Sequence, residues 1–228
     1  MSNILVKLPD GSERTLPEGA TGADLAADIG KRLAKDAVIA VVDGVEQDLD
    51  VALRDGAMVA IVTLDSEEAL HTLRHSTAHV LAQAVLELWP GATFAIGPPI
   101  EDGFYYDFEL PDGKTFNDDD LAAIDAKMRE VVKARQPFIR TEMSAADART
   151  LMAAHQYKRE IIDAVAGGEA GDLAGEAGAE VISFYRNTDD FVDMCVGPHV
   201  PDTGKLGHFK LMKVAGAYWR GDHRNEML

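Results

Sequence analysis

The chain has 228 residues with 22 Lys and Arg against 39 Asp and Glu, and its net charge of −17 opposes broad, sequence-independent binding to nucleic acid. Its hydrophobic (46%) and charged (27%) fractions are those of an ordinary globular protein, and no apolar run approaches the roughly 18 residues of a membrane span. A single cysteine excludes an internal disulfide and the N-terminus lacks a signal-peptide pattern, so a cytoplasmic protein is expected.

The first part of the chain, residues 1–63, has the pattern of a small β-grasp unit. Residues 9–11 form a hairpin-turn sequence, and Thr21 is a good N-cap for one predicted helix over residues 22–36. The predicted strands are residues 4–8, 14–16, 38–42 and 58–62. The order of strand, hairpin, helix and further strands is that of a β-grasp fold.

The next element carries the densest group of ionisable side chains. Residues 70–90 predict a helix, for which Asp65 and Ser66 are the expected N-cap residues. His75 and His79 are four residues apart, so they share one face of this helix with roughly 5–6 Å between their Cβ atoms. Two imidazoles in this arrangement can converge on one ion or one water molecule.

Short elements with frequent turns are predicted for the middle of the chain. Residues 91–110 mix aromatic side chains with Gly-Pro punctuation, which predicts two strands joined by a tight loop bearing Glu101 and Asp102. Asn117 and the three aspartates after it are typical of a helix start. The remaining predicted elements are helices over residues 118–135, 145–156 (capped by Ser144) and from 157, and strands over residues 138–143, 181–185 and 191–195.

Two segments outside these elements have distinctive compositions. Residues 167–178 are rich in glycine without the spacing of a phosphate-binding loop, so a flexible surface loop is expected. Residues 205–220 carry four basic side chains, His208 and three aromatic residues but no acid. This strip is typical either of a strand pair with an exposed lysine edge or of a nucleic-acid contact, and the pattern favours neither.

The only cysteine, Cys195, lies four residues before His199, with a Gly-Pro turn between them. A single His-x-x-x-His pair is a weak signal, but three histidines and one cysteine form a legitimate tetrahedral zinc set. Two other interpretations of Cys195 remain open at this point. It could be a buried, inert thiol, or a covalent nucleophile activated by His199.

Several longer phrases resemble a known family. LPDGS, GATGADLAADIGKRLAKDAV, VDGVEQDLD and DGAMVAIVT resemble the TGS module, and RHSTAHVLAQAV, AIGPPIEDGFYYDF, FVDMCVGPHVPDTG and HFKLMKVAGAYWRGD resemble the editing domain of bacterial threonyl-tRNA synthetases. The resemblance implies an α+β chain: a ubiquitin-like β-grasp TGS domain at residues 1–63 and a larger editing domain at 64–228, with an antiparallel sheet and packed helices. The chain is expected to end at the start of the linker to a catalytic core that it lacks.

The resemblance implies post-transfer editing, in which the ester of mischarged seryl-tRNA(Thr) is hydrolysed within a ligase. The expected partner is tRNA(Thr), through its seryl 3′ end, and no membrane is involved. The full-length protein is expected to be a homodimer, whereas the present region can be a monomer. ATP and a catalytic zinc ion would belong only to the missing core.

The resemblance also assigns roles to individual residues. The matching catalytic positions are His75, His79, Lys158, Asp193, Cys195 and His199, and the matching substrate-binding positions are Gly97 and Tyr106. Asp193 matches a carboxylate that recognises the serine amino group, and Lys158 matches a lysine that binds substrate or stabilises developing negative charge. Without the family resemblance, the sequence alone would indicate that Lys158 is a surface lysine on a helix and that Asp193 pairs with a nearby lysine.

The metal content of this site follows from the resemblance rather than from the pattern. Related alanine-type editing domains have the pattern of zinc proteins, whereas the threonine family is understood to work through ordered water. We therefore favour a metal-free site; if zinc binds, its ligands would be His75, His79, Cys195 and His199. The alternative functions are a non-catalytic appendage that positions tRNA and a freestanding zinc-dependent trans-editing hydrolase.

Overall fold

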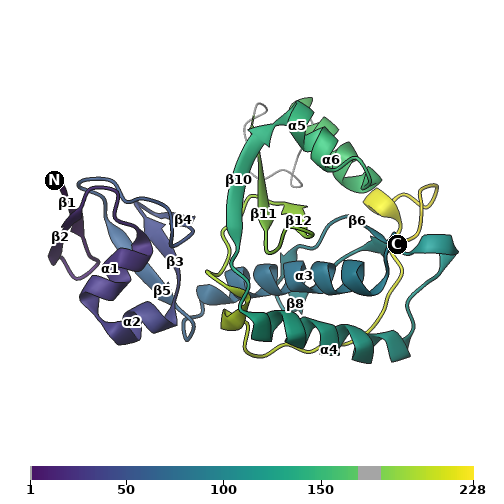
Figure 1. Ribbon diagram of the computed structural model, residues 1–228, viewed down its shortest axis with the longest axis horizontal. Coiled ribbons are helices and arrows are strands. Elements are labelled where there is room, and N and C mark those ends of the chain that lie inside the picture. The colour runs from purple at the N-terminus through teal and green to yellow at the C-terminus, as the bar shows by residue number, and fades with distance from the viewer. Residues whose placement is uncertain (1, 169–180) are drawn as a thin grey trace.

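The computed structural model describes residues 2–168 and 181–228, which form a smaller N-terminal unit and a larger unit beside it (Figure 1). Each unit has its own hydrophobic core. Over the described ranges, the structure contains no helix with the length and apolar character needed to cross a membrane. The glycine-rich loop predicted at residues 167–178 lies almost entirely outside the described residues.

The smaller unit is built from two antiparallel sheets and two short helices. Its elements are β1 (Asn3–Lys7), β2 (Glu13–Pro17), α1 (Gly22–Ile29), α2 (Lys31–Asp36), β3 (Ala37–Val42), β4 (Val45–Gln47) and β5 (Val59–Thr63). Strand β1 pairs with β2, and β3 lies between β4 and β5. The predicted order of strand, hairpin, helix and further strands is confirmed.

The single helix predicted over residues 22–36 is wrong, because the chain forms two helices there. Thr21 caps α1 through a capping box with Asp24, as its sequence position predicts. Gly30 then has an extended backbone (φ 167°, ψ 153°) and separates α1 from α2. Glycine lacks the helix propensity of the surrounding residues, so the break falls at this position.

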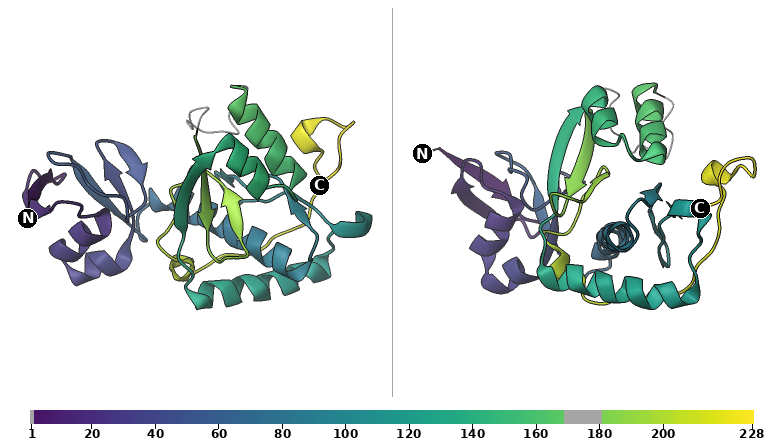
Figure 2. Two further views of the ribbon diagram at one scale, coloured as in Figure 1. Left: turned by 45° about the horizontal axis from the view of Figure 1, so that its top comes forward. Right: turned by 45° about the vertical axis from the view of Figure 1, so that its right-hand side comes forward.

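Helix α3 (Ala69–Leu88) runs through the larger unit beside α4 (Asp118–Ala134), and a three-stranded antiparallel sheet lies on the other side of α3 (Figures 1 and 2). The sheet has the order β10 (Ile139–Ser144), β11 (Val181–Arg186) and β12 (Val192–Met194). Helices α5 (Ala145–Leu151) and α6 (Gln156–Ala166) follow β10. This antiparallel sheet with packed helices confirms the expected α+β architecture.

Residues 91–110 form more and shorter strands than the two predicted. Strand β6 (Thr93–Phe94) pairs with β9 (Phe108–Glu109), and β7 (Pro99–Ile100) pairs with β8 (Gly103–Phe104). Glu101 and Asp102 lie in the turn between β7 and β8, where the tight loop was expected. Pro99 and Gly103 are part of the β7–β8 pairing, and both residue types limit regular strand hydrogen bonding.

One further local prediction is wrong, and one of two open interpretations fails. The N-cap of α3 is Glu68 rather than Asp65 or Ser66, because the Ser66 main-chain carbonyl accepts the Ala69 N–H and no side chain caps the helix. Residues 206–217 form neither helix nor strand, so the strand-pair interpretation of the basic strip fails. Short 3₁₀ turns, Thr203–Lys205 and Trp219–Gly221, flank this irregular segment, and a third lies at Pro111–Gly113.

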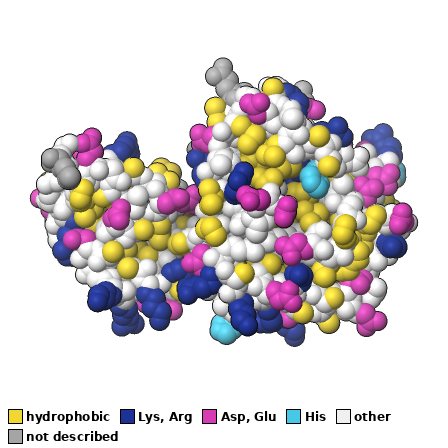
Figure 3. Space-filling model, in the orientation of Figure 1, with side chains coloured by type: hydrophobic (Ala, Val, Ile, Leu, Met, Phe, Trp, Pro, Cys, Tyr) yellow, Lys and Arg dark blue, Asp and Glu magenta, His cyan; other side chains and the backbone are white. Residues whose placement is uncertain are grey.

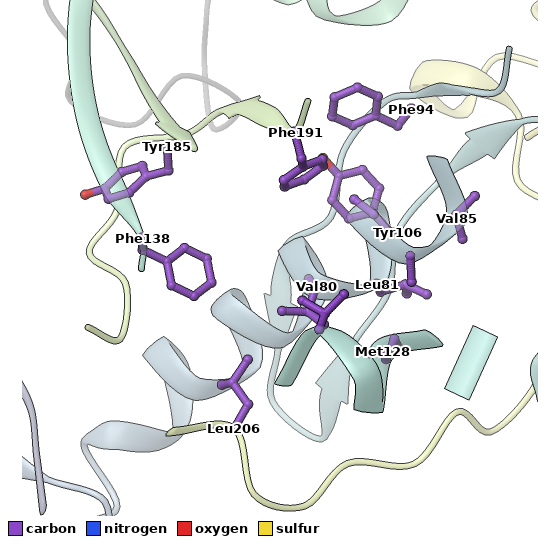
Figure 4. Packing of buried hydrophobic residues seen from close by; sticks show 14 of the residues in the cluster. Val80, Leu81, Val85, Phe94, Tyr106, Met128, Phe138, Tyr185, Phe191 and Leu206 are labelled. Atoms are coloured by element: carbon purple, nitrogen blue, oxygen red, sulfur yellow. The ribbon is translucent and has the colours of Figure 1, made fainter. Parts of the chain in front are cut away.

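The larger unit has hydrophobic side chains on its surface (Figure 3) and buries the middle of α3 in its interior. On the face in Figure 3, acidic and basic side chains are interspersed, whereas hydrophobic side chains gather over the larger unit. Helix α3 is buried on nearly every side between Ser76 and Val85, so its polar side chains in this span face protein rather than water. Aromatic side chains cover the helix in two groups, Phe138 with Tyr185 and Phe94 with Tyr106 and Phe191 (Figure 4).

Candidate active site

The four predicted His and Cys side chains meet in the larger unit. Helix α3 supplies His75 and His79, and the segment after β12 supplies Cys195 and His199. One potential ligand atom from each residue lies within 4.8 Å of the others. Cys195 Sγ is 3.0 Å from His75 Nε2 and 3.4 Å from His199 Nε2. The fold therefore joins two pairs that are 120 residues apart in the chain.

His199 is fixed on both of its ring nitrogens. It is 1% exposed, and its Nδ1 lies 2.9 Å from Ser76 Oγ. Ser76 Oγ accepts the main-chain N–H of Val200 at 3.2 Å, so its hydroxyl hydrogen is free for His199 Nδ1. When Ser76 donates to Nδ1, the proton of the neutral imidazole is on Nε2 and faces Cys195; when Nδ1 carries the proton, Ser76 accepts it and the Nε2 lone pair faces Cys195. Phe138 stacks on the same imidazole with a centroid separation of 4.5 Å.

A second group of buried polar side chains adjoins this cluster. Lys158 Nζ lies 2.5 Å from Asp193 Oδ1, and both side chains are at most 4% exposed. Tyr106 donates its hydroxyl to Asp193 Oδ2 at 2.6 Å and accepts a hydrogen bond from Lys158 Nζ at 2.9 Å. His79 Nε2 is 3.5 Å from Asp193 Oδ2, so His79 connects the two groups.

This geometry decides between the interpretations of Lys158 and Asp193 that the sequence left open. Lys158 is buried rather than a surface helix lysine, because its side chain extends from α6 to Asp193 of β12. The interpretation without the family resemblance expected Asp193 to pair with a nearby lysine. The structure shows this pairing, and the lysine is Lys158. A fully buried ion pair with a shared tyrosine is a costly arrangement that stability alone does not require.

Position 97 requires glycine, because the Tyr106 ring lies too close to leave room for a side chain. A Cβ atom at Gly97 would lie 2.0 Å from Tyr106 Cδ2, far inside van der Waals contact. The Gly97 backbone therefore lies directly against the tyrosine ring that hydrogen-bonds Asp193. Gly97 and Tyr106, the two substrate-binding positions that the family resemblance suggests, therefore contact each other beside the buried Lys158–Asp193 pair.

Burial sets the protonation states of the cluster. It lowers the pKa of His75 to about 3 and that of His79 to about 4, so both imidazoles are neutral at pH 7. Burial raises the pKa of Cys195, which keeps a thiol at this position. The thiolate is the nucleophilic form of cysteine, so this environment argues against a covalent mechanism.

Asp193 keeps its negative charge despite complete burial. Desolvation would raise its pKa, but Lys158, His79 and the hydrogen bonds from Lys158 and Tyr106 outweigh that penalty and lower the pKa overall. An ionised carboxylate is thus held beside the neutral His79 ring. His79 Nδ1 is buried and has no hydrogen-bond partner among the described residues.

Stability should fall as the pH falls from about 6.5 toward 4. The unfolded imidazoles take up protons near pH 6.5, whereas folded His75 and His79 resist protonation until about pH 3 and 4. The unfolded state binds more protons across this window, so each histidine removes up to about 1.4 kcal/mol of stability per pH unit. Urea unfolding of wild type at several pH values in EDTA measures this slope.

The control for this pH series is a substitution on the same helix. His75→Gln should give a shallower slope than wild type, whereas His71→Gln, at an exposed position, should keep the wild-type slope. Equal slopes for wild type and His75→Gln would show that burial does not hold His75 neutral.

The donor set also fits a zinc ion. Three imidazoles and one thiol are common zinc ligands, and all four potential ligand atoms are mutually close. His75, His79, Cys195 and His199 would hold such an ion, with Ser76 orienting His199 from behind. Four protein ligands would close a tetrahedral zinc site, so zinc would supply a water molecule of lowered pKa only if one of these side chains left a coordination position open.

Sequence reasoning missed three residues that organise this site. Ser76 orients the His199 imidazole, and Tyr185 packs edge-on against the same ring with a centroid separation of 4.4 Å. Asp48, in the smaller unit, accepts the His199 main-chain N–H at 2.7 Å. Ser76 is adjacent to His75 in the sequence, which is a weak signal, whereas no local pattern marks Asp48 or Tyr185.

Comparison with known proteins found matching family models and relatives over this chain. The TGS domain model matches residues 4–63, and the model described as "Threonyl and Alanyl tRNA synthetase second additional domain" matches residues 182–228. Threonine–tRNA ligases from Rubrobacter xylanophilus and Maricaulis maris are 48% and 51% identical to this chain over 223 and 228 residues. That from Geobacter sp. is 47% identical over 230 residues.

These alignments cover 98–100% of this chain, and the chain spans about a third of the length of these relatives (33%, 33% and 34%). A TGS domain followed by this second additional domain, with its buried His/Cys cluster, defines a segment of an aminoacyl-tRNA synthetase. The chain corresponds to the N-terminal region of threonyl-tRNA synthetases, the homologues that match it over nearly its whole length.

Proposed function

We propose that this chain hydrolyses the ester bond of seryl-tRNA(Thr) and thereby edits the mischarged product of a threonyl-tRNA synthetase. The observation that carries this proposal is the buried Lys158–Asp193 ion pair in contact with the His/Cys cluster. Such a pair is expensive to bury, and it supplies both an anion for an ammonium group and a cation for an oxyanion.

The similar size of serine and threonine explains why a second, hydrolytic site would be needed. Serine lacks one methyl group of threonine. A pocket can discriminate against a substrate that lacks one such group by only about 1–3 kcal/mol, or roughly 10- to 200-fold. A synthetic site for threonine therefore admits serine at a measurable frequency. A hydrolytic site shaped for the smaller serine side chain can remove the error and spare threonine.

The geometry supports distinct roles for the polar residues. Asp193 remains ionised and would attract the serine ammonium group, which has the opposite charge. Lys158 is held within hydrogen-bonding distance of Tyr106 and Asp193 and would stabilise negative charge on the tetrahedral intermediate. Gly97 and Tyr106 would contact the terminal adenosine and the seryl group.

His75 and Cys195 are the partly exposed members of the His/Cys cluster, and of these two His75 carries the imidazole that can meet a water molecule. Its pKa of about 3 makes the imidazole a weak base. In this proposal, neutral His75 accepts a hydrogen bond from the attacking water and orients it toward the ester carbonyl. The water proton passes to the ribose oxygen as the ester bond breaks, while His79 and His199 hold the surrounding geometry.

We propose that this hydrolysis needs no bound metal, although the residues also fit zinc. The partner in this proposal is the seryl 3′ end of tRNA(Thr), and the longer protein that contains this region would be a homodimer. A freestanding zinc-dependent hydrolase and a tRNA-positioning appendage without catalysis are the alternatives, and they differ in the outcome of one experiment.

That experiment follows seryl-tRNA(Thr) hydrolysis by wild type and His75→Ala, with and without EDTA, at high protein concentration. Wild type should release serine at the same rate with or without EDTA, and His75→Ala should lose about 100-fold or more of that rate. His71→Ala, on the exposed side of the same helix, serves as the matched control.

The other outcomes favour other functions. Loss of wild-type activity in EDTA that returns with added zinc would indicate a zinc hydrolase. No hydrolysis by wild type, together with measurable tRNA binding, would indicate the positioning appendage and contradict the proposed activity.

A further inference from the structure

On the basis of the function proposed above, we propose that Asp48 of the TGS domain is a positioning residue for the hydrolytic site of the second domain. Asp48 follows strand β4 directly and is 8% exposed. Both of its carboxylate oxygens are used outside its own domain. Oδ1 accepts the main-chain N–H of His199 at 2.7 Å, and Oδ2 accepts the hydroxyl of Tyr185 at 2.6 Å.

Tyr185 connects Asp48 to the turn that precedes His199, because its hydroxyl donates to Asp48 and also contacts Gly197. A Cβ atom at Gly197 would lie 2.0 Å from the Tyr185 hydroxyl oxygen, so this hydroxyl packs directly against the Gly197 backbone. Gly197 also has a positive φ of 76°, which favours glycine. The Tyr185 ring meets the His199 imidazole edge-on with centroids 4.4 Å apart. One carboxylate therefore fixes both ends of the segment from Gly197 to His199.

This segment sets the position of two members of the His/Cys cluster. The Gly197 main-chain N–H donates to Cys195 Sγ at 3.2 Å, and His199 Nε2 lies 3.4 Å from the same sulfur. Cys195 Sγ in turn is 3.0 Å from His75 Nε2. A shift of the segment would therefore move the groups around the proposed water site, and misplacement by about 1 Å can cost roughly 100-fold in rate.

Other contacts also join the two domains, which allows positioning to be separated from docking. Val38, Ile39 and Val62 of the TGS domain pack in the core of the larger unit. Lys205 donates a hydrogen bond to the main-chain carbonyl of Lys35. Because these contacts do not involve Asp48, the domains should remain docked when Asp48 is changed.

The test compares Asp48→Ala, Asp48→Asn and Tyr185→Phe in the full chain, with Asp50→Asn as the matched control at an exposed position two residues away. Two readouts are measured: kcat and KM for seryl-tRNA(Thr), and the rate at which iodoacetamide alkylates Cys195. Cys195 is the only cysteine of the chain, so the alkylation signal is unambiguous.

Asp48→Ala should lower kcat about tenfold or more, with little change in KM, and should change the Cys195 alkylation rate at least about threefold. Asp48→Asn should recover much of both values, because its amide can still accept from His199 N–H and can donate to the Tyr185 oxygen. Tyr185→Phe should fall between wild type and Asp48→Ala. Asp50→Asn should match wild type.

A purely structural role gives a different result. If Asp48→Ala lowers only the melting temperature, and keeps the wild-type kcat and alkylation rate below that temperature, Asp48 serves docking and the inference is wrong. If Asp48→Ala does not fold, Asp48→Asn and Tyr185→Phe decide by the same two readouts. If wild type hydrolyses no ester, the proposed function fails, and the alkylation rates alone support or overturn the inference about Asp48.

Discussion

Replacing Lys158 with methionine should lower the free energy of unfolding by about 3–5 kcal/mol and abolish ester hydrolysis. Methionine keeps much of the volume of the side chain but removes its charge. Asp193 would then be an ionised carboxylate at 1% exposure without its counter-ion, which lies 2.5 Å away in the wild type. The substrate would also lose the cation proposed to stabilise the oxyanion.

A second substitution separates the effect on stability from the effect on activity. In Lys158→Met/Asp193→Asn the uncompensated charge disappears, and the asparagine can still accept the hydrogen bond from Tyr106. The double variant should therefore recover most of the lost stability but none of the activity. Urea unfolding and the seryl-ester assay measure the two quantities.

Lys133→Met is the control, because Lys133 is exposed on α4 and its replacement should change neither quantity. A Lys158→Met protein as stable as wild type would show that the ion pair is not the buried, mutually dependent pair described above. Retained hydrolysis in that protein would remove Lys158 from the proposed mechanism.

Replacing Gly97 with alanine should reduce hydrolysis about 100-fold or more while lowering stability by only about 1–3 kcal/mol. The added methyl group would meet the Tyr106 ring at 2.0 Å, so the ring must move. Tyr106 connects Asp193 and Lys158 through hydrogen bonds of 2.6 and 2.9 Å, and both would be disturbed. The loss should appear mainly in kcat, because the reacting groups are displaced.

Gly103→Ala provides a control with the same chemical change. A Cβ at Gly103 meets no atom within 4 Å, and the residue lies in the neighbouring strand β8. Gly103→Ala should therefore keep wild-type activity and stability. If Gly97→Ala hydrolyses the seryl ester as fast as Gly103→Ala, Tyr106 does not have to stay in place for catalysis.

Local chemistry made much of the fold predictable. Thr21 and Asn117 form capping boxes where the sequence places helix starts, and Ser144 caps α5. His75 and His79 lie on one helix with ring centroids 5.1 Å apart, as four-residue spacing requires. These features depend on neighbours within a few residues, so a single sequence contains them.

The features that the sequence did not predict depend on distant partners or on weak local preferences. The hydrogen bonds of Asp48 to Tyr185 and His199 span 137 and 151 residues, and no periodicity encodes them. The burial of Lys158 depends on how α6 packs, which its residue types do not reveal. Gly30 divides one periodic segment into two helices, although isolated glycines are often tolerated within helices.

The most direct test of the central claim is the ratio of the hydrolysis rates of seryl-tRNA(Thr) and threonyl-tRNA(Thr), measured with excess wild-type protein in EDTA. A site shaped for serine predicts that the seryl ester is hydrolysed at least about tenfold faster, the lower bound for discrimination by one methyl group. Equal rates for the two esters, or no hydrolysis of either, would contradict an editing site built from the buried Lys158–Asp193 pair and the His/Cys cluster.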